Sequence, residues 1–421
     1  MEVSDSCRKF RKKKKLVMSN RKAFPAWSFI GDICLCRHNP SSEKMRILEL
    51  SHSSGNGSTS SSDEKSQDAD YFDYKIPCLS DELETLILAR LPITEHWKLC
   101  CLNKQFLSFL KTGEVFRIRR EIGLKEPVVF IASDESNWWS FNSRFTSFKK
   151  IPVIPSDYSF DCGDKESFAA GTNLFVSGKE IDGTVVWGFE FATNKWFKAP
   201  KMINPRCLFA SATKGIFAYI AGGLETTTCQ EVLSSAEKYN SESRSWDRLP
   251  EMKQKRKFCS GCYMDNRFYV LGGRDEYDND LVSGEFFDEG KNIWILIPGM
   301  LKDIPLPSSR SPPLVAVANN ELYTLDACSN ELKVYVKESN SWKTLGPVPV
   351  RADTRGGWGV AFKSLGNELL VIGGATSSSH CAFTIYTCCP DPRIEKLKWT
   401  RIVCGSTNLN PFIRNCAVML A

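Results

Sequence analysis

The sequence predicts a mainly β protein, in which four-stranded sheets repeat around a ring, preceded by a small all-α domain. Short apolar runs of strand length recur between residues 174 and 374, and most of them end at glycines. A tryptophan follows each run, and these tryptophans recur about every 50 residues. Residues 76–123 instead space their apolar side chains as helices do.

The clearest copy of the repeat runs from Phe217 to Trp246. Its first apolar run ends at Gly222 and Gly223, where glycine turns the chain without steric cost. Apolar runs cut by glycine pairs and by Asn/Ser turns are typical of antiparallel strands. The five copies end in Trp196, Trp246, Trp294, Trp342 and Trp399.

This part of the chain resembles kelch-repeat β-propellers. A period near 50 residues, with about four strands, a glycine pair and a late tryptophan, is the spacing of kelch repeats. Packing such sheets around an axis buries both faces of each sheet, with the tryptophan wedged between neighbours. Two copies depart from the pattern. In one of them Lys179 follows Gly178 in place of a second glycine, and in the other Asp326 and Ala327 replace both glycines.

Five copies leave the closure of the ring open, so the two flanks of the repeat region matter. Pro127–Ala132, Trp138–Phe141 and Phe145–Ile151 predict three strands of a blade that lacks its first strand. Arg414–Ala421 predicts one more strand after the last copy. We predict that this strand completes the incomplete blade and gives six blades. The alternative is five blades with a loose C-terminal tail.

The helical stretch begins at Ser80, which can cap a helix that ends before Pro92. Its apolar residues form one stripe: Leu83, Leu86, Ile87 and Leu91. Thr94 and Asn103 can cap two further helices, and Val115–Ile122 predicts a last amphipathic piece. Because so few short helices make a poor core, we expect the stripe to continue into a partner.

Residues 76–110 resemble an F-box, although Ser80 stands where the family usually has proline and Phe106 where it has tryptophan. An F-box followed directly by kelch repeats resembles the plant F-box/kelch-repeat family, over about residues 76–421. The expected domains are a disordered basic, Ser-rich tail (1–73), an F-box (74–123) and a kelch propeller (124–421). The residues that carry the F-box match are Leu79, Asp81, Glu82, Leu83, Ile87, Arg90, Leu91, Pro92, Asn103, Lys104 and Phe106.

The resemblance implies a substrate-recognition subunit of an SCF-type cullin E3 ubiquitin ligase. The F-box would bind a Skp-type adaptor of the cullin scaffold, and the propeller would bind a target protein for ubiquitination. The expected adaptor contacts are Ile76, Pro77, Leu79, Leu83, Leu86, Ile87, Leu91 and Pro92. The alternative is a kelch protein-interaction scaffold outside any ligase, with the helices as a structural cap.

Little in the sequence favours catalysis, and we expect no cofactor or metal. The chain has 4 histidines, and only His380 follows the start of the propeller, so the ligands of a galactose oxidase-like copper site cannot be assembled. Cys259 and Cys262 have redox-like spacing but sit at the start of a strand, which favours core packing over redox chemistry. The glycine pairs end strands and lack the following helix of a phosphate-binding loop.

The composition predicts a protein of the nucleus or cytoplasm, or of both. Hydrophobic residues make up 42% of the 421, the net charge is +6, and the start of the chain is charged, unlike a secretory signal. Many of the 17 cysteines lie inside apolar strand runs, which favours a reducing compartment. Arg8–Lys15 predicts a nuclear import signal, a weak nucleic-acid contact or a plain solvated tail. We expect no membrane partner and no specific nucleic acid.

Arginines recur near the start of the first strand of successive blades. Repeated positions map onto one ring, so these side chains are expected to cluster at one mouth of the channel. There they could bind an acidic or phosphorylated segment of the target. Alternatively each arginine satisfies carbonyls of its own blade, and Trp358 packs between blades. The candidate target-binding residues are Arg206, Arg256, Arg310, Arg355, Trp358 and Arg414.

Overall fold

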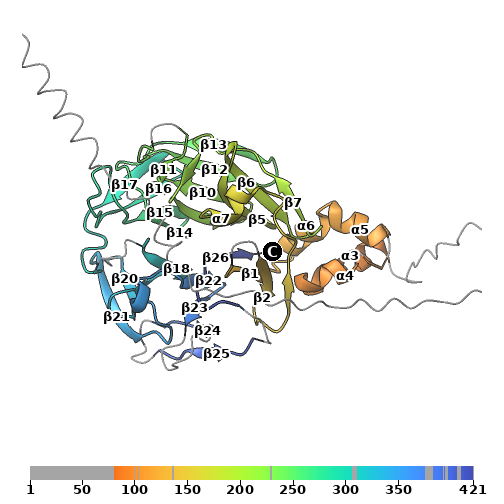
Figure 1. The fold of residues 1–421 in the computed structure, drawn as a ribbon. Helices are drawn as coiled ribbons and strands as arrows, with labels where there is room; N and C mark the ends of the chain where they lie inside the picture. The colour runs from red at the N-terminus through yellow and green to blue at the C-terminus, as the bar shows by residue number, and fades with distance from the viewer. Residues whose placement is uncertain are drawn as a thin grey trace, which may run out of the picture. The chain divides into compact units, whose positions relative to one another are not determined.

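Six four-stranded antiparallel sheets, the blades, make up most of the chain (Figure 1). The computed structural model describes residues 80–420 except 100, 103, 135–136, 228–229, 306–310, 375–382, 392, 394–396 and 405–408. The predicted tail, three predicted adaptor contacts (Ile76, Pro77 and Leu79) and Arg310 therefore lie outside the described residues.

The blades are numbered here in ring order, each with its innermost strand first. Blade 1 contains β26 (Asn415–Leu420), β1 (Pro127–Ala132), β2 (Trp138–Asn142) and β3 (Phe148–Lys150). Blade 2 contains β4 (Glu166–Ala170), β5 (Asn173–Glu180), β6 (Gly183–Glu190) and β7 (Lys195–Lys198). Blade 3 contains β9 (Ala210–Lys214), β10 (Phe217–Ala221), β12 (Ala236–Asn240) and β13 (Ser245–Leu249), beside the small pair β8 (Arg206–Cys207) and β11 (Leu224–Glu225).

The other three blades repeat the same order. Blade 4 contains β14 (Ser260–Met264), β15 (Arg267–Leu271), β16 (Gly284–Asp288) and β17 (Ile293–Ile297). Blade 5 contains β18 (Leu314–Ala318), β19 (Glu321–Asp326), β20 (Glu331–Val336) and β21 (Ser341–Pro347). Blade 6 contains β22 (Ala361–Leu365), β23 (Glu368–Gly374), β24 (Phe383–Cys388) and β25 (Thr400–Ile402).

The innermost strands close the ring. They contact one another in the order β26, β4, β9, β14, β18, β22 and back to β26, and Figure 1 shows several of them near the centre. The closing strand β26 pairs antiparallel with β1, from Pro127 opposite Leu420 to Ala132 opposite Asn415. The prediction of six blades closed by the C-terminal strand is confirmed, and the five-blade alternative is wrong.

The repeated tryptophans connect neighbouring blades. Each indole N–H donates to a backbone carbonyl where the chain leaves the preceding blade: Trp196 to Pro152, Trp246 to Pro200, Trp294 to Pro250, Trp342 to Met300 and Trp399 to Pro347, over 2.7–3.2 Å. A side chain of one blade thereby satisfies a carbonyl of another, so the 50-residue spacing has a direct structural cause.

The glycine pairs are required at two of the blade seams. Gly222 and Gly223 have φ of +67° and +98°, a region that disfavours other residues. A Cβ on Gly222 would also lie 2.5 Å from the carbonyl oxygen of Arg256, in the linker to the next blade. The third pair differs, because Gly373 and Gly374 lie within β23.

The helices precede the propeller and share its core. They are α3 (Asp81–Arg90), η2 (Ile93–Glu95), α4 (His96–Leu99), α5 (Lys104–Lys111) and α6 (Glu114–Glu121), with α7 (Tyr158–Cys162) and η3 (Asp353–Arg355) later in the chain. Ser80 caps α3 as predicted, since its hydroxyl accepts the Leu83 N–H at 3.4 Å. The predicted cap Thr94 lies inside η2, and Asn103 lies outside the described residues.

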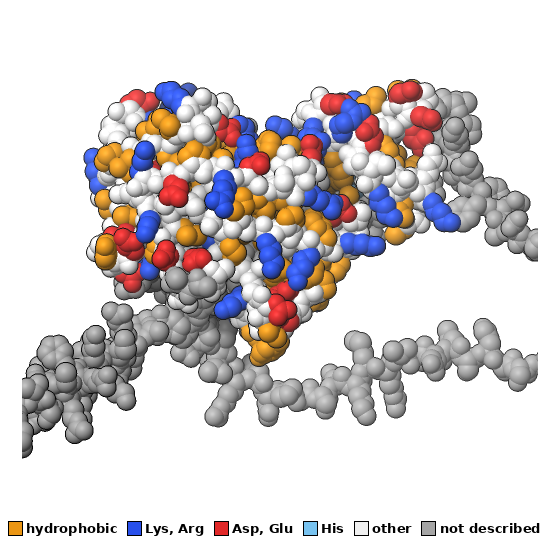
Figure 2. Space-filling model, turned by 90° about the horizontal axis from the view of Figure 1, so that it is seen from above, with side chains coloured by type: hydrophobic (Ala, Val, Ile, Leu, Met, Phe, Trp, Pro, Cys, Tyr) orange, Lys and Arg blue, Asp and Glu red, His pale blue; other side chains and the backbone are white. Residues whose placement is uncertain are grey.

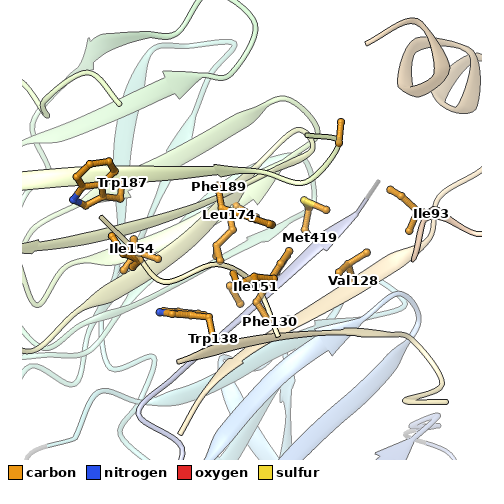
Figure 3. Close-up of a cluster of buried hydrophobic side chains, with 14 of the residues drawn as sticks. Ile93, Val128, Phe130, Trp138, Ile151, Ile154, Leu174, Trp187, Phe189 and Met419 are labelled. Carbon is orange, nitrogen blue, oxygen red and sulfur yellow. The ribbon is translucent and has the colours of Figure 1, made fainter. Parts of the chain in front are cut away.

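One apolar cluster joins the helices to blades 1 and 2 (Figure 3). It contains Ile93 and Val115 from the helical part together with Val128 of β1 and Met419 of β26. None of the described helices is long and apolar enough to cross a membrane. Because of the shared cluster, the helical part packs against blade 1, which closes the ring.

We predict that Met419→Ala lowers the free energy of unfolding by about 2–5 kcal/mol, because it empties a fully buried site in this shared cluster. Leu420→Ala is the matched control, because the neighbouring side chain is 49% exposed. Denaturant unfolding followed by circular dichroism measures both. Equal losses in the two variants would contradict the role given to Met419.

Candidate functional site

The outward face of α3 carries exposed apolar side chains. Leu83 and Ile87 lie one turn apart and are 50% and 49% exposed. Leu86 is half-buried and Pro92 is exposed. Asp81 and Glu82 occupy the first turn, where acidic side chains stabilise a helix. Four of the predicted adaptor contacts therefore reach solvent at least in part: Leu83, Leu86, Ile87 and Pro92.

The opposite side of the same helix faces the core. Ala89 is buried, and Leu88 and Leu91 pack against the cluster shared with the propeller. The predicted stripe is thus divided, because Leu91 packs inward while Leu83 and Ile87 face out. Sequence analysis also missed Leu102, a 68% exposed apolar residue between α4 and α5, which no periodic pattern marks.

A buried arginine fixes the end of α3 against the propeller. The Arg119 guanidinium donates to the carbonyls of Ala89 and Leu91 at 2.7 and 2.8 Å, and pairs with Glu126 at 3.1 Å. Glu126 also accepts the backbone N–H of Ile93 at 2.9 Å, directly before β1 begins. Because Arg119 is 1% exposed, this network holds the outward face of α3 in a defined place.

Arg206 and Arg256 have equivalent buried places in blades 3 and 4. Arg206 pairs with Glu237 at 2.5 Å and donates to the carbonyls of Gly222 and Ser235. Arg256 pairs with Glu285 at 2.8 Å and donates to the carbonyls of Gly272 and Ser283. Both arginines are 0% exposed.

This burial corrects the expectation that Arg206 and Arg256 face a target. Their contacts match the alternative, in which each arginine satisfies carbonyls of its own blade. The paired carboxylates complete the network, since Glu237 accepts the N–H groups of Ile203 and Asn204, each at 2.8 Å. The sequence held a signal for this pairing, because Glu237 and Glu285 occupy the same place in successive copies.

The remaining candidates of this set lie closer to solvent. Arg355 is exposed in η3, with its guanidinium 4.9 Å from the ring centre of Phe412. Trp358 is half-buried, as is Arg414, whose backbone N–H donates to the carbonyl of Ala132 at 2.9 Å. Their role in target binding stays a prediction. Basic and acidic side chains are interspersed on the face shown in Figure 2.

Cys259, Cys262 and His96 have pKa values shifted by burial. Burial raises the pKa of Cys259 to about 11 and of Cys262 to about 12, so both thiols stay protonated. Both belong to apolar clusters, as the core-packing interpretation requires. Burial and the nearby Arg119 lower the pKa of His96 to about 4. In the part of the chain that the structure describes, no group of three or more His, Cys, Asp or Glu could hold a metal ion.

We predict that Glu237→Gln lowers the free energy of unfolding by about 3–5 kcal/mol, because it leaves the buried Arg206 charge uncompensated. Glu242→Gln is the control in the next turn of the same blade, where the pair with Arg120 is exposed and contributes little. Denaturant unfolding compares the two. A loss no larger for Glu237→Gln than for the control would contradict this account.

The carboxyl group of Glu166, the first residue of β4, should make the stability of the fold depend on pH. It accepts the Leu208 N–H at 2.6 Å, and burial raises its pKa from 4.5 to about 7. The folded chain therefore keeps a proton that the unfolded chain releases, and stability falls as the pH rises from about 4.5 to about 7. We expect Glu166→Gln to remove this contribution. The stability of this variant relative to the parent chain, measured by thermal unfolding across pH, should increase through that window and stay constant above it.

Comparisons with known proteins agree with the fold. A family model described as Kelch motif matches residues 255–301, which span blade 4. The F-box/kelch-repeat protein At3g27150 of Arabidopsis thaliana is 50% identical over 85% of this chain and 86% of that protein. The F-box/kelch-repeat protein SKIP11 of the same plant is 35% identical over 79% and 72%.

A third relative extends the match along the chain. The F-box/kelch-repeat protein At1g26930 of Arabidopsis thaliana is 32% identical over 90% of this chain and 89% of that protein. The three matches each cover more than two thirds of both chains, and the resemblance drawn from residues 76–421 is confirmed. The chain therefore belongs to the F-box/kelch-repeat protein family.

Proposed function

We propose that the chain is a non-catalytic substrate-recognition subunit of an SCF-type cullin E3 ubiquitin ligase. In this proposal α3 and its neighbouring helices bind a Skp-type adaptor, and the propeller binds the protein to be ubiquitinated. Family membership supports the assignment, because the three relatives are named for both an F-box and kelch repeats. The work of the chain is to bring a target lysine close to the charged ubiquitin carrier.

The observation that carries the proposal is the half-exposed pair Leu83 and Ile87. Fully burying a leucine or isoleucine side chain is worth about 1.5–3 kcal/mol, so an adaptor that covers the pair gains affinity there. A helical part that served only as a cap would need the inward side, with Ala89 and Leu91, and not this pair. The outward face therefore favours the ligase role over the scaffold alternative.

The contacts between helices and propeller suit a receptor that holds its target at a fixed place. The shared apolar cluster and the Arg119–Glu126 pair join the helices to β1. Arg120 adds an exposed pair with Glu242, in the turn between β12 and β13, at 3.2 Å. These contacts lie at the end of the blades where β1 begins, so we place the target at the opposite end, with Arg355, Trp358 and Arg414 as candidate contacts.

The place of action we propose is the nucleus or cytoplasm, where Skp-type adaptors and cullins assemble with F-box proteins. The basic run at Arg8–Lys15 supports nuclear import as one route. We assign no catalytic step to this chain.

The test is capture of a purified Skp-type adaptor, with its cullin, by the full chain. We expect Leu83→Arg combined with Ile87→Arg to abolish capture, because two charges replace the apolar face. Ile87 is preferred to Leu91 because Leu91 packs against the core and its loss would also disturb folding. Ile122→Arg is the matched control, since Ile122 is a 40% exposed apolar residue just after α6.

Circular dichroism should show the same fold and the same melting temperature for all three chains. Undiminished capture by the double variant would sink the assignment of this face. Failure of the folded parent chain to capture any adaptor would sink the ligase role itself and favour the scaffold.

A further inference from the structure

The outermost strand of each blade forms the outer edge of its sheet, where one row of backbone N–H and C=O groups faces away from the other strands. Such an edge can pair with a strand of another chain. Proteins ordinarily prevent this with charged residues, proline, β-bulges or very short strands. The six outer strands of the propeller are β3, β7, β13, β17, β21 and β25.

Five of the six outer strands carry protection of this kind. β3 (3 residues) and β7 (4 residues) each contain two lysines, and β25 has Arg401 among its 3 residues. β13 carries Asp247 and Arg248. β21 carries Lys343 and ends in Pro347, and its pairing with β20 shifts register. Each of these strands is therefore a poor edge for a further strand.

β17, the outer strand of blade 4, lacks all of these features. It has no charge and no proline, and it keeps a regular register against β16, with which alone among the described strands it pairs. Ile293 is 45% exposed, and Ile295 and Leu296 are half-buried, so apolar side chains reach the outer rim of the ring (Figure 1). The five residues of the strand are Ile293, Trp294, Ile295, Leu296 and Ile297.

Ile295 ends a row of large apolar side chains that crosses blade 4. Tyr269 of β15 lies opposite Phe286 of β16, and Phe286 lies opposite Ile295 of β17. The ring centres of Tyr269 and Phe286 are 5.2 Å apart. Aromatic and β-branched neighbours on adjacent strands stabilise a sheet. A β-branched residue on a further strand would therefore extend this row beyond the edge of the blade.

The order of residues along β17 suits a second copy of the same strand. In an antiparallel pair of two such strands centred on Ile295, that residue would lie opposite its own copy. Ile293 would lie opposite Ile297, so β-branched residues would meet at each position of this face. On the other face, Trp294 would lie opposite Leu296. The strand is therefore self-complementary, and no like charges would meet in a two-fold interface.

Pairing through β17 would leave the helices uncovered. In the order of the innermost strands, β14 of blade 4 stands three places from β26 of blade 1 in both directions around the ring. The helices share their apolar cluster with blades 1 and 2. Two chains joined at their blades 4 would therefore keep both α3 helices away from the contact.

We propose that β17 is a dimerisation edge, and that two copies of this chain pair antiparallel through it, with Ile295 at the two-fold axis. The sheets of the two blades 4 then form one continuous sheet. The dimer holds two propellers together and keeps both adaptor faces free. This inference goes beyond the proposed function and does not depend on it.

The test measures the mass of the purified full chain by analytical ultracentrifugation over a range of concentrations. We expect the parent chain to dimerise with a Kd in the micromolar range, as suits an interface of modest area. Ile295→Lys should weaken the dimer by about tenfold or more, because two like charges would lie opposite each other at the axis. Ile295→Glu should weaken it for the same reason.

A mixture of these two variants tests the axis directly. Ile295→Lys and Ile295→Glu chains should form a mixed dimer, since opposite charges then meet. Misfolded chains would show no such recovery, so the mixture separates lost pairing from a lost fold. Ile293→Lys changes a more exposed side chain, and it should also weaken the dimer because its charge would lie against Ile297 of the second copy.

Thr344→Lys is the matched control, because it adds the same charge at an exposed position of β21, the outer strand of the neighbouring blade. It should dimerise as the parent chain does. A parent chain that stays monomeric would overturn the proposal and leave the edge to a strand of a different protein. Dimerisation that neither lysine variant of β17 weakens would overturn it as well, as would a mixture of the two folded Ile295 variants that stays monomeric.

Adaptor capture is measured separately. Ile295→Lys should capture the Skp-type adaptor as the parent chain does, and the Leu83→Arg, Ile87→Arg chain should still dimerise. Dimerisation without adaptor capture by the parent chain would refute the ligase role and leave the dimerisation edge standing.

Discussion

The antiparallel pairing of β26 with β1 gives blade 1 its innermost strand, and through it every blade keeps a neighbour on both sides. A four-stranded sheet exposes two apolar faces, and only a closed ring covers them all. The tryptophans of blades 2 to 6 then connect each blade to the one before it by an indole hydrogen bond. Closure and this repeated bond together account for the period that the sequence displays.

The same ring shows how one residue type serves two purposes. Arg206 and Arg256 serve the structure of the propeller, because Glu237 and Glu285 neutralise their charges in sites that solvent does not reach. Burying such an ion pair costs free energy, since both ions lose their hydration. The hydrogen bonds with the surrounding backbone offset part of this cost. We therefore expect the proposed target contacts among the loops and linkers, which differ from blade to blade.

The fold was predictable because its determinants are local and repeated. Six blades followed from the tryptophan spacing, from three predicted strands before the first copy and from one after the last, and Ser80 marked the start of α3. The candidate sites were less predictable, because they depend on contacts between distant residues. The stripe on α3 gave no sign that Leu91 would face inward and Leu83 outward, since that choice is made by packing against the cluster shared with the propeller.

The position of Met419 has a consequence for how the chain matures. It packs in the same cluster as Ile93 and Val115, so β26, which is synthesised after the other described strands, completes the apolar surface on which the first described helices pack. A chain cut short before Asn415 lacks both the closed ring and this complete surface. Premature termination or trimming of β26 should therefore weaken the closure of the ring and the packing of the helices together.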